Sequence, residues 1–409
     1  MADVPLHVGL LAGPDTLDVY GDTLRHVCTG LIGEGVQVSI VGDAGLGLEE
    51  HFGPPVRLLT VPRTRILRPR EHLGALGERL SRQGCRVLHA LSESALRWLG
   101  MLRGGQSFGV VGTLSCGMER SAGMMGPAGG AVSLGAGWVE GGGGVAGWLG
   151  RLAGVDRYRQ SWEGRLFVDR WVGLSSRVAQ EGRERLGKDV EVVGLGTFVG
   201  EEISFGRGAV HPPGLLCTTP LVADCGVDRL VEAFGRVSAV DPRMMLFLCG
   251  EGPREGQIRR QVRELGLGER VMFTAVPVSW RDRVGAVDVF VEPGCGVQVR
   301  SDLVEAMAAG MCCVGVRGDA LDVLEHGVSG QLVAAGDSFG LTDALRRIVL
   351  DERYAVGLAE GGQRRAREVG SAARTAIRLA GLYGEVARGL LQTERSGVSR
   401  VLAGGRLPD

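Results

Sequence analysis

The sequence predicts an α/β protein with two doubly wound parallel-sheet domains that face each other across a cleft. Its 409 residues are too many for one domain of ordinary size and suit two. Short apolar runs alternate with amphipathic segments, and this plan occurs once in each half of the chain. Glycines and prolines gather near residues 196–212, as in a hinge between two domains.

The first half of the chain supports this prediction element by element. It opens with an apolar strand at 6–11, a segment of helical spacing at 22–33 and a second strand at 36–41. Two further strand–helix–strand units follow. Their predicted strands are 87–91, 109–113, 171–174 and 190–193, and their helices are 93–102 and 176–187.

The second half repeats the alternation and ends in helices. Strands are predicted at 215–218, 245–249, 271–274, 287–291, 312–316 and 331–333. Helices are predicted at 227–237, 254–265, 278–285, 302–309, 320–326, 338–350 and 353–369. The last helix, 373–391, has one apolar face. In open parallel sheets ligands bind at the carboxyl ends of the strands, so two facing sheets predict a site in the cleft between them.

Composition excludes several functional classes. Hydrophobic residues are 44%, charged residues 23% and the net charge is −1, which favours a soluble globular protein without affinity for nucleic acid. Nine cysteines form no C-x-x-C pair and lie mostly in apolar runs, which favours a reducing, cytoplasmic location. The N-terminus has no signal-peptide pattern, and no apolar run reaches the about 18 residues of a membrane span. No His, Cys and Asp cluster has metal-ligand spacing, so we expect neither a metal nor a cofactor.

Four segments of the second half resemble the donor-binding half of retaining GT-B glycosyltransferases of family-4 type. They are LFLCGEGP at 246–253, LGLGERVMFT at 265–274, VEAMAAG at 304–310 and LEHGVSGQLV at 324–333. The likeness covers residues 190–391 well and the first half only in outline. It implies the GT-B fold, in which two Rossmann-like domains face each other, with a nucleotide-sugar donor bound by the second domain.

On this resemblance we predict an acceptor domain at 1–200, a donor domain at 201–372, a helix at 373–391 that crosses back to the acceptor domain, and a tail at 392–409. Residues 121–150 hold twelve glycines and form an insertion in the first domain. The insertion is either a flexible surface loop or an acceptor lid in which Trp138 and Trp148 offer flat faces to a sugar or lipid.

The donor-binding candidates are Gly250, Gly252, Gly294, Gly296, Arg300, Ser301 and Glu305. A glycine loop that enters a helix N-terminus presents backbone N–H groups and a positive dipole end to a diphosphate, and Ser301 suits the N-cap of that helix. The resemblance implies that Glu305 accepts hydrogen bonds from the ribose hydroxyls. Gly250 and Gly252 either let the backbone approach a ligand or only form a tight turn.

Several positions depart from the family pattern. Val297 replaces the first acid of the Glu-x7-Glu pair, and Pro220 and Cys225 replace an Arg and a Lys that neutralise the leaving diphosphate. The 46 basic residues include a single lysine, Lys188, so simple drift from lysine would have left an arginine at 225. Fixed cations contribute several kcal/mol to such transition states. Arg300 either restores this charge as a bidentate phosphate fork or is a solvent-facing loop arginine.

The first half offers weaker candidates. Ser115 stands where the family often has a His, and it is a candidate catalytic residue. His89 ends a predicted strand at the expected cleft face, which makes it a second candidate. A histidine with a structural role in the core or in a loop would show the same sequence pattern. Gly21 is what remains of the paired glycines of the acceptor and phosphate loop. The arginine-rich run 63–70 is either a weak contact for anionic lipid head groups or a solvated loop.

The residues therefore favour an enzyme that transfers a hexosyl group from a nucleotide-sugar donor to an unknown acceptor. The alternative is a catalytically impaired GT-B scaffold that binds nucleotide, glycan or a partner protein, as the substitutions at 115, 220, 225 and 297 would suit. A third hypothesis, a GT-B epimerase, needs acid/base carboxylates and histidines in the cleft, and none can be identified.

Overall fold

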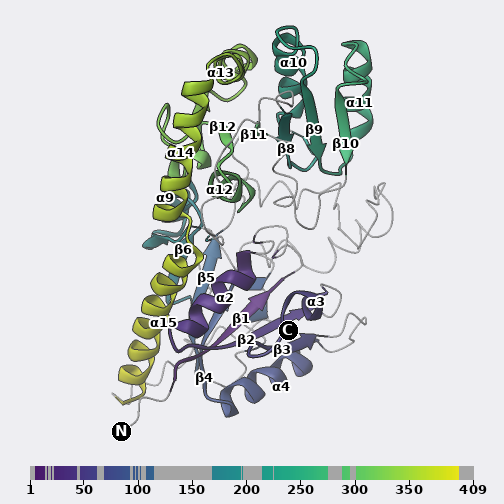
Figure 1. The fold of residues 1–409 in the computed structure, drawn as a ribbon. Coiled ribbons are helices and arrows are strands. Elements are labelled where there is room, and N and C mark those ends of the chain that lie inside the picture. Colours follow the sequence, from purple (N-terminus) through teal and green to yellow (C-terminus); the bar gives the residue numbers. More distant parts are fainter. Residues whose placement is uncertain are drawn as a thin grey trace.

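The computed structural model contains two parallel sheets, one in each half of the chain (Figure 1). The structure describes residues 5–13, 16, 20, 23–43, 47–61, 69–92, 95, 96, 98, 99, 102, 107–114, 168–194, 196, 214–223, 225–274, 288–294 and 301–395. Within these residues the first sheet has the order β3-β2-β1-β4-β5-β6-β7 and the second β10-β9-β8-β11-β12-β13. Every strand pair in both sheets is parallel. The predicted fold class of two doubly wound parallel-sheet domains is confirmed.

The N-terminal domain alternates strands and helices around its sheet. Its strands are β1 (His7–Ala12), β2 (Gln37–Asp43), β3 (Arg57–Val61), β4 (Cys85–Ala90), β5 (Gly109–Leu114), β6 (Arg170–Gly173) and β7 (Val190–Val192). Its described helices are α2 (Thr23–Gly33), α3 (Leu48–His51), α4 (Pro69–Arg82) and α9 (Ser176–Leu186). All residues of β1 and β5 are buried, as expected for central strands covered on both faces.

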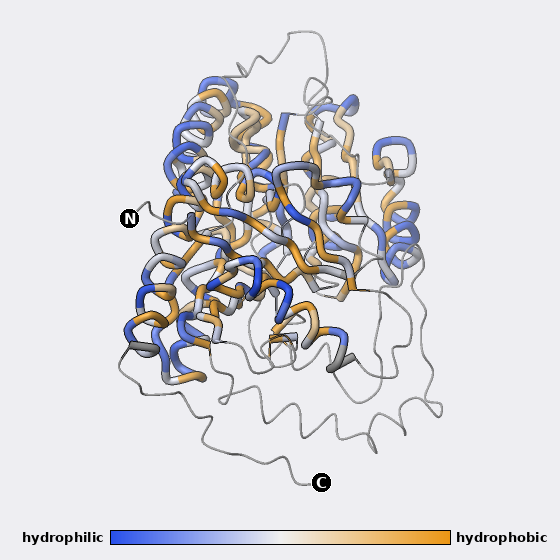
Figure 2. The backbone as a smooth tube through the Cα atoms, turned by 90° about the horizontal axis from the view of Figure 1, so that it is seen from below, coloured by the Kyte–Doolittle hydropathy of each residue, from blue (hydrophilic) through white to orange (hydrophobic). Residues whose placement is uncertain are grey.

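The C-terminal domain follows the same plan. Its strands are β8 (Gly214–Cys217), β9 (Met245–Cys249), β10 (Val271–Thr274), β11 (Val289–Glu292), β12 (Cys312–Val316) and β13 (Gln331–Val333). Its helices are α10 (Val227–Val237), α11 (Glu255–Glu264), α12 (Ser301–Ala308), the 3-10 turn η3 (Asp319–Asp322), α13 (Ser338–Leu350) and α14 (Glu352–Val369). The helices alternate between hydrophilic and hydrophobic residues along the tube of Figure 2, while the strands are mainly hydrophobic.

Three described elements of the N-terminal domain were not predicted, and the shortest of them is the four-residue helix α3. The strand β3 has the sequence RLLTV and lies at the edge of the sheet, where only Leu59 is buried, so its apolar signal is short. The helix α4 has a polar composition interrupted by two glycines, which hides its apolar stripe. The predicted helix 278–285 and the glycine-rich insertion 121–150 lie outside the described residues. The domain boundaries drawn from the sequence remain predictions.

The last helix, α15 (Ala372–Arg395), packs on the N-terminal domain, against α2, β4 and β5 (Figure 1). Small residues let it approach closely. A Cβ atom on Gly30 of α2 would lie 2.6 Å from the Cβ of Ala376, and one on Gly109 of β5 would lie 2.3 Å from Cγ1 of Val386. These distances are too short for any side chain, so glycine is required at both positions.

A carboxylate of the C-terminal domain caps a helix of the N-terminal domain. The Oδ2 atom of Asp322 in η3 accepts a hydrogen bond from the backbone N–H of Ser176, the first residue of α9. The first N–H groups of a helix have no partner within the helix, and a negative charge there also interacts favourably with the helix dipole. The guanidinium of Arg365 donates to the carbonyl oxygens of Asp322 and Val323 and so holds η3 in place.

We expect Asp322→Ala to weaken the attachment between the two domains. Losing a cap of this kind costs about 0.5–2 kcal/mol. Scanning calorimetry should show a broader, lower transition, because the two domains then unfold less cooperatively. The matched control is Asp351→Ala. The carboxylate of Asp351 caps α14 within the C-terminal domain, where it accepts a hydrogen bond from the backbone N–H of Tyr354 at 3.0 Å. An Asp322→Ala transition as sharp as that of the unmodified protein would contradict this prediction.

Candidate functional site

Three loops meet at the carboxyl ends of β8, β9 and β11. In the strand order β8 lies between β9 and β11, so the chain leaves β8 toward one side and crosses to the other. At such a reversal open α/β sheets bind ligands, at the carboxyl ends of the strands. We refer to the region bordered by the loop after β8, the turn at 250–254 and the segment 292–294 as the crevice.

Glycines hold these loops against one another. Gly226, which precedes α10, has φ +71°, and a Cβ atom there would lie 2.0 Å from the carbonyl oxygen of Pro293. A Cβ on Gly250 would lie 2.3 Å from the carbonyl oxygen of Thr219, and one on Gly252 would lie 2.3 Å from that of Leu221. The loop after β8 therefore occupies the space in front of Gly250 and Gly252. Tight packing of the two loops explains why both positions are glycine.

Backbone hydrogen bonds fix the same contact. The N–H of Leu221 donates to the carbonyl oxygen of Glu251 at 3.0 Å, and the N–H of Arg254 donates to that of Leu221 at 3.0 Å. The loop after β8 and the turn after β9 therefore form one rigid rim of the crevice. Rigid backbone is what a binding site needs to hold its side chains in position.

The helix α12 begins at this crevice and carries Ser301 and Glu305. Both residues are buried, at 7% and 8% exposure. The described part of α12 begins at Ser301, and the residue before it lies outside the described part of the chain, so the N-cap role of Ser301 stays a prediction. Gly294, at the end of the β11 segment, lies against the loop before α10, where a Cβ would be 3.6 Å from the carbonyl oxygen of Cys225. The structure therefore brings Gly250, Gly252, Gly294, Ser301 and Glu305 to the ends of adjacent strands.

An unpredicted carboxylate lies beside them. The hydroxyl of Thr218, at the end of β8, donates to Oδ2 of Asp302 in the first turn of α12 at 2.7 Å. This hydrogen bond ties α12 to the neighbouring strand and places an acid at the helix N-terminus, where it is favourable. The one signal in the sequence is an acid in the first turn of a helix, which occurs in many ordinary helices.

Pro220 and Cys225, which stand where the resemblance implies an Arg and a Lys, both lie among the described residues. Pro220 is exposed on the loop after β8, and Cys225 is buried just before α10. Burial raises the pKa of the Cys225 thiol, and the nearby charge of Arg254 acts in the opposite direction. A neutral thiol at this position cannot balance a phosphate charge, whereas Arg254 brings a guanidinium close to it.

Several candidates lie outside the described residues. They are Gly21, Ser115, Gly296 and Arg300, together with Val297 and the two tryptophans of the insertion. Nothing in the structure tests their predicted roles. Side chains of the arginine-rich run 63–70 also lie outside the described part of the chain.

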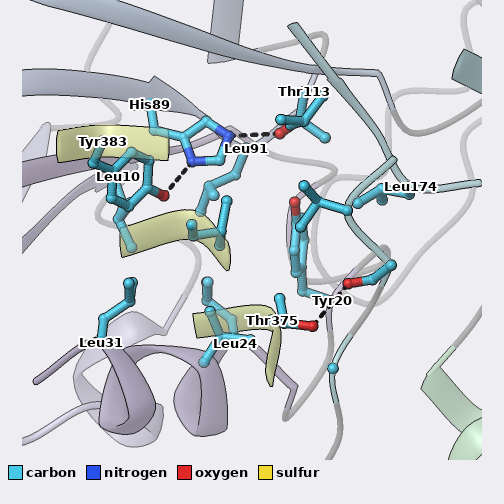
Figure 3. A pocket seen from close by; sticks show the side chains of 16 residues that line it. Leu10, Tyr20, Leu24, Leu31, His89, Leu91, Thr113, Leu174, Thr375 and Tyr383 are labelled. Carbon is cyan, nitrogen blue, oxygen red and sulfur yellow. Dashed lines mark hydrogen bonds between the residues drawn. The ribbon is translucent and has the colours of Figure 1, made fainter. Parts of the chain in front are cut away.

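His89 lies in the core of the N-terminal domain, where α15 covers the sheet (Figure 3). Its Nδ1 is 2.6 Å from the hydroxyl of Tyr383 on α15, and its Nε2 is 2.7 Å from the hydroxyl of Thr113 on β5. The ring borders a cavity of about 20 Å³ and is 1% exposed. Burial lowers the pKa of the imidazole to about 3. The expected position on the open cleft face is therefore wrong, and the geometry supports a structural role.

Among the described residues, no group of three or more His, Cys, Asp or Glu side chains is arranged to hold a metal ion. None of the helices described is both long and apolar enough to cross a membrane.

Known proteins resemble this chain in two ways. A family model described as glycosyl transferases group 1 matches residues 212–351, which contain the crevice. The lipopolysaccharide core biosynthesis glycosyltransferase LpsE of Rhizobium meliloti is 28% identical over 198 residues, which are 46% of this chain and 55% of LpsE. The matched segment thus spans about half of the length of this curated relative.

Solved structures match nearly the whole chain. A sucrose-phosphate synthase from Thermosynechococcus elongatus superposes with a TM-score of 0.70 at 18% identity, covering 94% of this chain and 100% of the other. HepE of Anabaena, solved in complex with UDP and glucose, gives a TM-score of 0.68 at 16% identity and covers 92% of this chain and 99% of its own. At these identities the likeness establishes the fold. The chain therefore has the GT-B fold, and its residues 212–351 match the glycosyl transferases group 1 model.

Proposed function

We propose that the protein is a glycosyltransferase that takes a sugar from a nucleotide-sugar donor bound at the crevice of the C-terminal domain. The observation that carries the proposal is the buried carboxylate of Glu305, one turn into α12, in a segment that matches glycosyl transferases group 1. A carboxylate in this position can accept two hydrogen bonds from neighbouring hydroxyls, as a ribose offers. HepE, which shares the fold, was solved with UDP and with UDP-glucose.

The acceptor is proposed to bind on the N-terminal side of the cleft, and the donor to bind without a resident metal ion. Retention of configuration at the anomeric carbon belongs to the same proposal. The general base and the acceptor class are not assigned, because Ser115 and Gly21 lie outside the described residues and His89 is buried in the core.

Calorimetric titration tests the donor site. The protein is titrated with UDP, GDP, ADP and the corresponding nucleotide-glucoses, with and without Mg²⁺. We expect one diphosphate to bind with a Kd in the micromolar range and Glu305→Gln to weaken it about tenfold, since hydrogen bonds to an ionised acceptor are the stronger ones. The matched control is Glu264→Gln, an exposed acid on α11 of the same domain, which should leave the affinity unchanged.

Absence of binding across the panel would overturn the proposal and favour the catalytically impaired scaffold. Binding that Glu305→Gln leaves intact would show that the nucleotide uses another site. A metal-dependent affinity would contradict only the proposal that no resident metal is needed.

A further inference from the structure

We propose that Arg254 supplies the positive charge that holds the donor diphosphate, in place of the lysine that Cys225 replaces. This inference rests on the proposed function, because it assigns a residue to the same site. Arg254 directly follows the segment 246–253, and the packing of the turn after β9 against the loop after β8 fixes its backbone at the rim of the crevice.

The backbone of Arg254 is fixed at the rim. The residue ends the turn after β9 and precedes α11, and its N–H donates to the carbonyl oxygen of Leu221 at 3.0 Å. Its side chain is 23% exposed, so the guanidinium lies partly shielded from water rather than extended into it. Partial shielding strengthens the interaction of a charge with an anion, because the effective dielectric constant is lower there.

The head of the side chain points toward the N-terminus of α10. Its Nη2 is 3.9 Å from Oδ2 of Asp228, in the first turn of α10, and its Nε donates to Oε1 of Gln257 at 3.1 Å. Gly226, two residues before Asp228, packs on Pro293 at the end of β11. The guanidinium therefore lies beside the first turn of α10, the helix whose N-terminus Gly226 holds against the end of β11.

The charge of Arg254 also reaches Cys225. It acts on the Cys225 thiol in the direction that lowers its pKa, while burial, the larger effect, and the charge of Asp228 both raise it. Asp228 balances this cation until a ligand binds. A diphosphate bound beside position 225 would then attract the guanidinium, a positive charge that the neutral thiol does not supply.

The existing contacts leave Arg254 able to bind phosphate. A guanidinium has more N–H donors than the oxygens of Gln257 and Asp228 use, and its planar fork suits phosphate oxygens. The 3.9 Å contact with Asp228 is at the limit of an ion pair and is partly exposed, so it holds the side chain only loosely. Asp228 orients the guanidinium, and a diphosphate, which carries more negative charge, competes with it successfully.

Titration with a matched pair of ligands tests the assignment. The first ligand is the nucleoside diphosphate that binds the unmodified protein, and the second is the same nucleoside without phosphates. We expect Arg254→Gln to weaken diphosphate binding about tenfold and to leave the nucleoside affinity unchanged. Arg254→Lys should keep most of the diphosphate affinity. Arg259→Gln is the control, because Arg259 lies on α11, which follows Arg254, but stacks on Phe273 and pairs with Glu255.

Two further variants separate a direct role from a structural one. If Arg254 acts on the ligand, Asp228→Asn should preserve or raise diphosphate affinity, because it releases the guanidinium. If Arg254 only supports the fold through Asp228, Asp228→Asn should weaken binding as much as Arg254→Gln does, and the inference is overturned. Cys225→Lys in the Arg254→Gln background should restore diphosphate affinity, since it returns the cation to position 225.

The outcomes distinguish this inference from the proposed function. Equal diphosphate affinity of Arg254→Gln and the unmodified protein overturns the inference alone. Failure of the unmodified protein to bind any nucleotide overturns the proposed function and this inference together. Urea unfolding midpoints of all variants establish that each is folded before it is titrated.

Discussion

Replacing Tyr383 by alanine is expected to destabilise the N-terminal domain by about 3–5 kcal/mol, the usual range for truncating a large buried aromatic side chain. Tyr383 is completely buried, with an exposed fraction of 0%, and is the largest of the fully buried side chains described. Its ring joins α15 to the sheet, and its hydroxyl is 2.6 Å from Nδ1 of His89. The alanine variant would leave a cavity and would also remove the imidazole's partner.

Urea unfolding followed by circular dichroism measures this effect. Ile377→Ala, on the same helix, is the control, because Ile377 is 53% exposed and its truncation should cost little. Tyr383→Phe keeps the ring and isolates the hydrogen bond, with an expected cost of about 1–3 kcal/mol from the polar group left without a partner. If Tyr383→Ala cost no more than Ile377→Ala, α15 would not be part of the N-terminal core.

Acid is expected to destabilise the protein through His89. Burial lowers the pKa of the folded-state imidazole from 6.5 to about 3. The unfolded state therefore binds a proton below pH 6.5 that the folded state does not bind until about pH 3, and stability falls as the pH falls through this window. Lowering the pH from 7 to 5 should cost about 2 kcal/mol from this residue, since one pH unit in the window is worth about 1.4 kcal/mol.

Unfolding free energies of the unmodified protein and of His89→Gln at both pH values test this prediction. Glutamine cannot gain a proton, so the variant should be less stable at pH 7 but should lose less stability on acidification. Burial also lowers the pKa of His7, which hydrogen-bonds with Ser39 at 2.9 Å and contributes in the same direction. His7 is present in both proteins, so the difference between them reports on His89. Equal pH dependence of the two would contradict the prediction.

Alternation of apolar and amphipathic segments was sufficient to predict the fold class. Helices such as α10 bury residues at helical spacing, among them Leu230, Val231 and Phe234, and this spacing is readable in the sequence. The edge strand β3 was missed because its sequence, RLLTV, begins with a charged residue and is interrupted by Thr60, which leaves no continuous apolar run.

The candidate site was only partly predictable, for a different reason. Glu305 lies within a motif that is continuous in the sequence, whereas Arg254 and Cys225 are 29 positions apart, and hydrogen bonds between the turn at 250–254 and the loop after β8 bring their segments together. The partner of Asp302 is Thr218, 84 positions away, and only the crossover from β8 to β11 makes them neighbours. His89 lies near the end of the apolar strand β4 in either role, so only its burial and the hydroxyl groups around its ring favour the structural role over the catalytic one.

The return of α15 to the N-terminal domain has a consequence for how the protein matures on the ribosome. The first sheet is synthesised early, but its face over β4 and β5 stays uncovered until residues 372–395 emerge. The C-terminal sheet and its helices, complete by residue 369, are ready to fold before that point. The N-terminal domain is therefore synthesised first but completes its folding last. Until then its uncovered apolar face is a candidate binding site for a chaperone on the nascent chain.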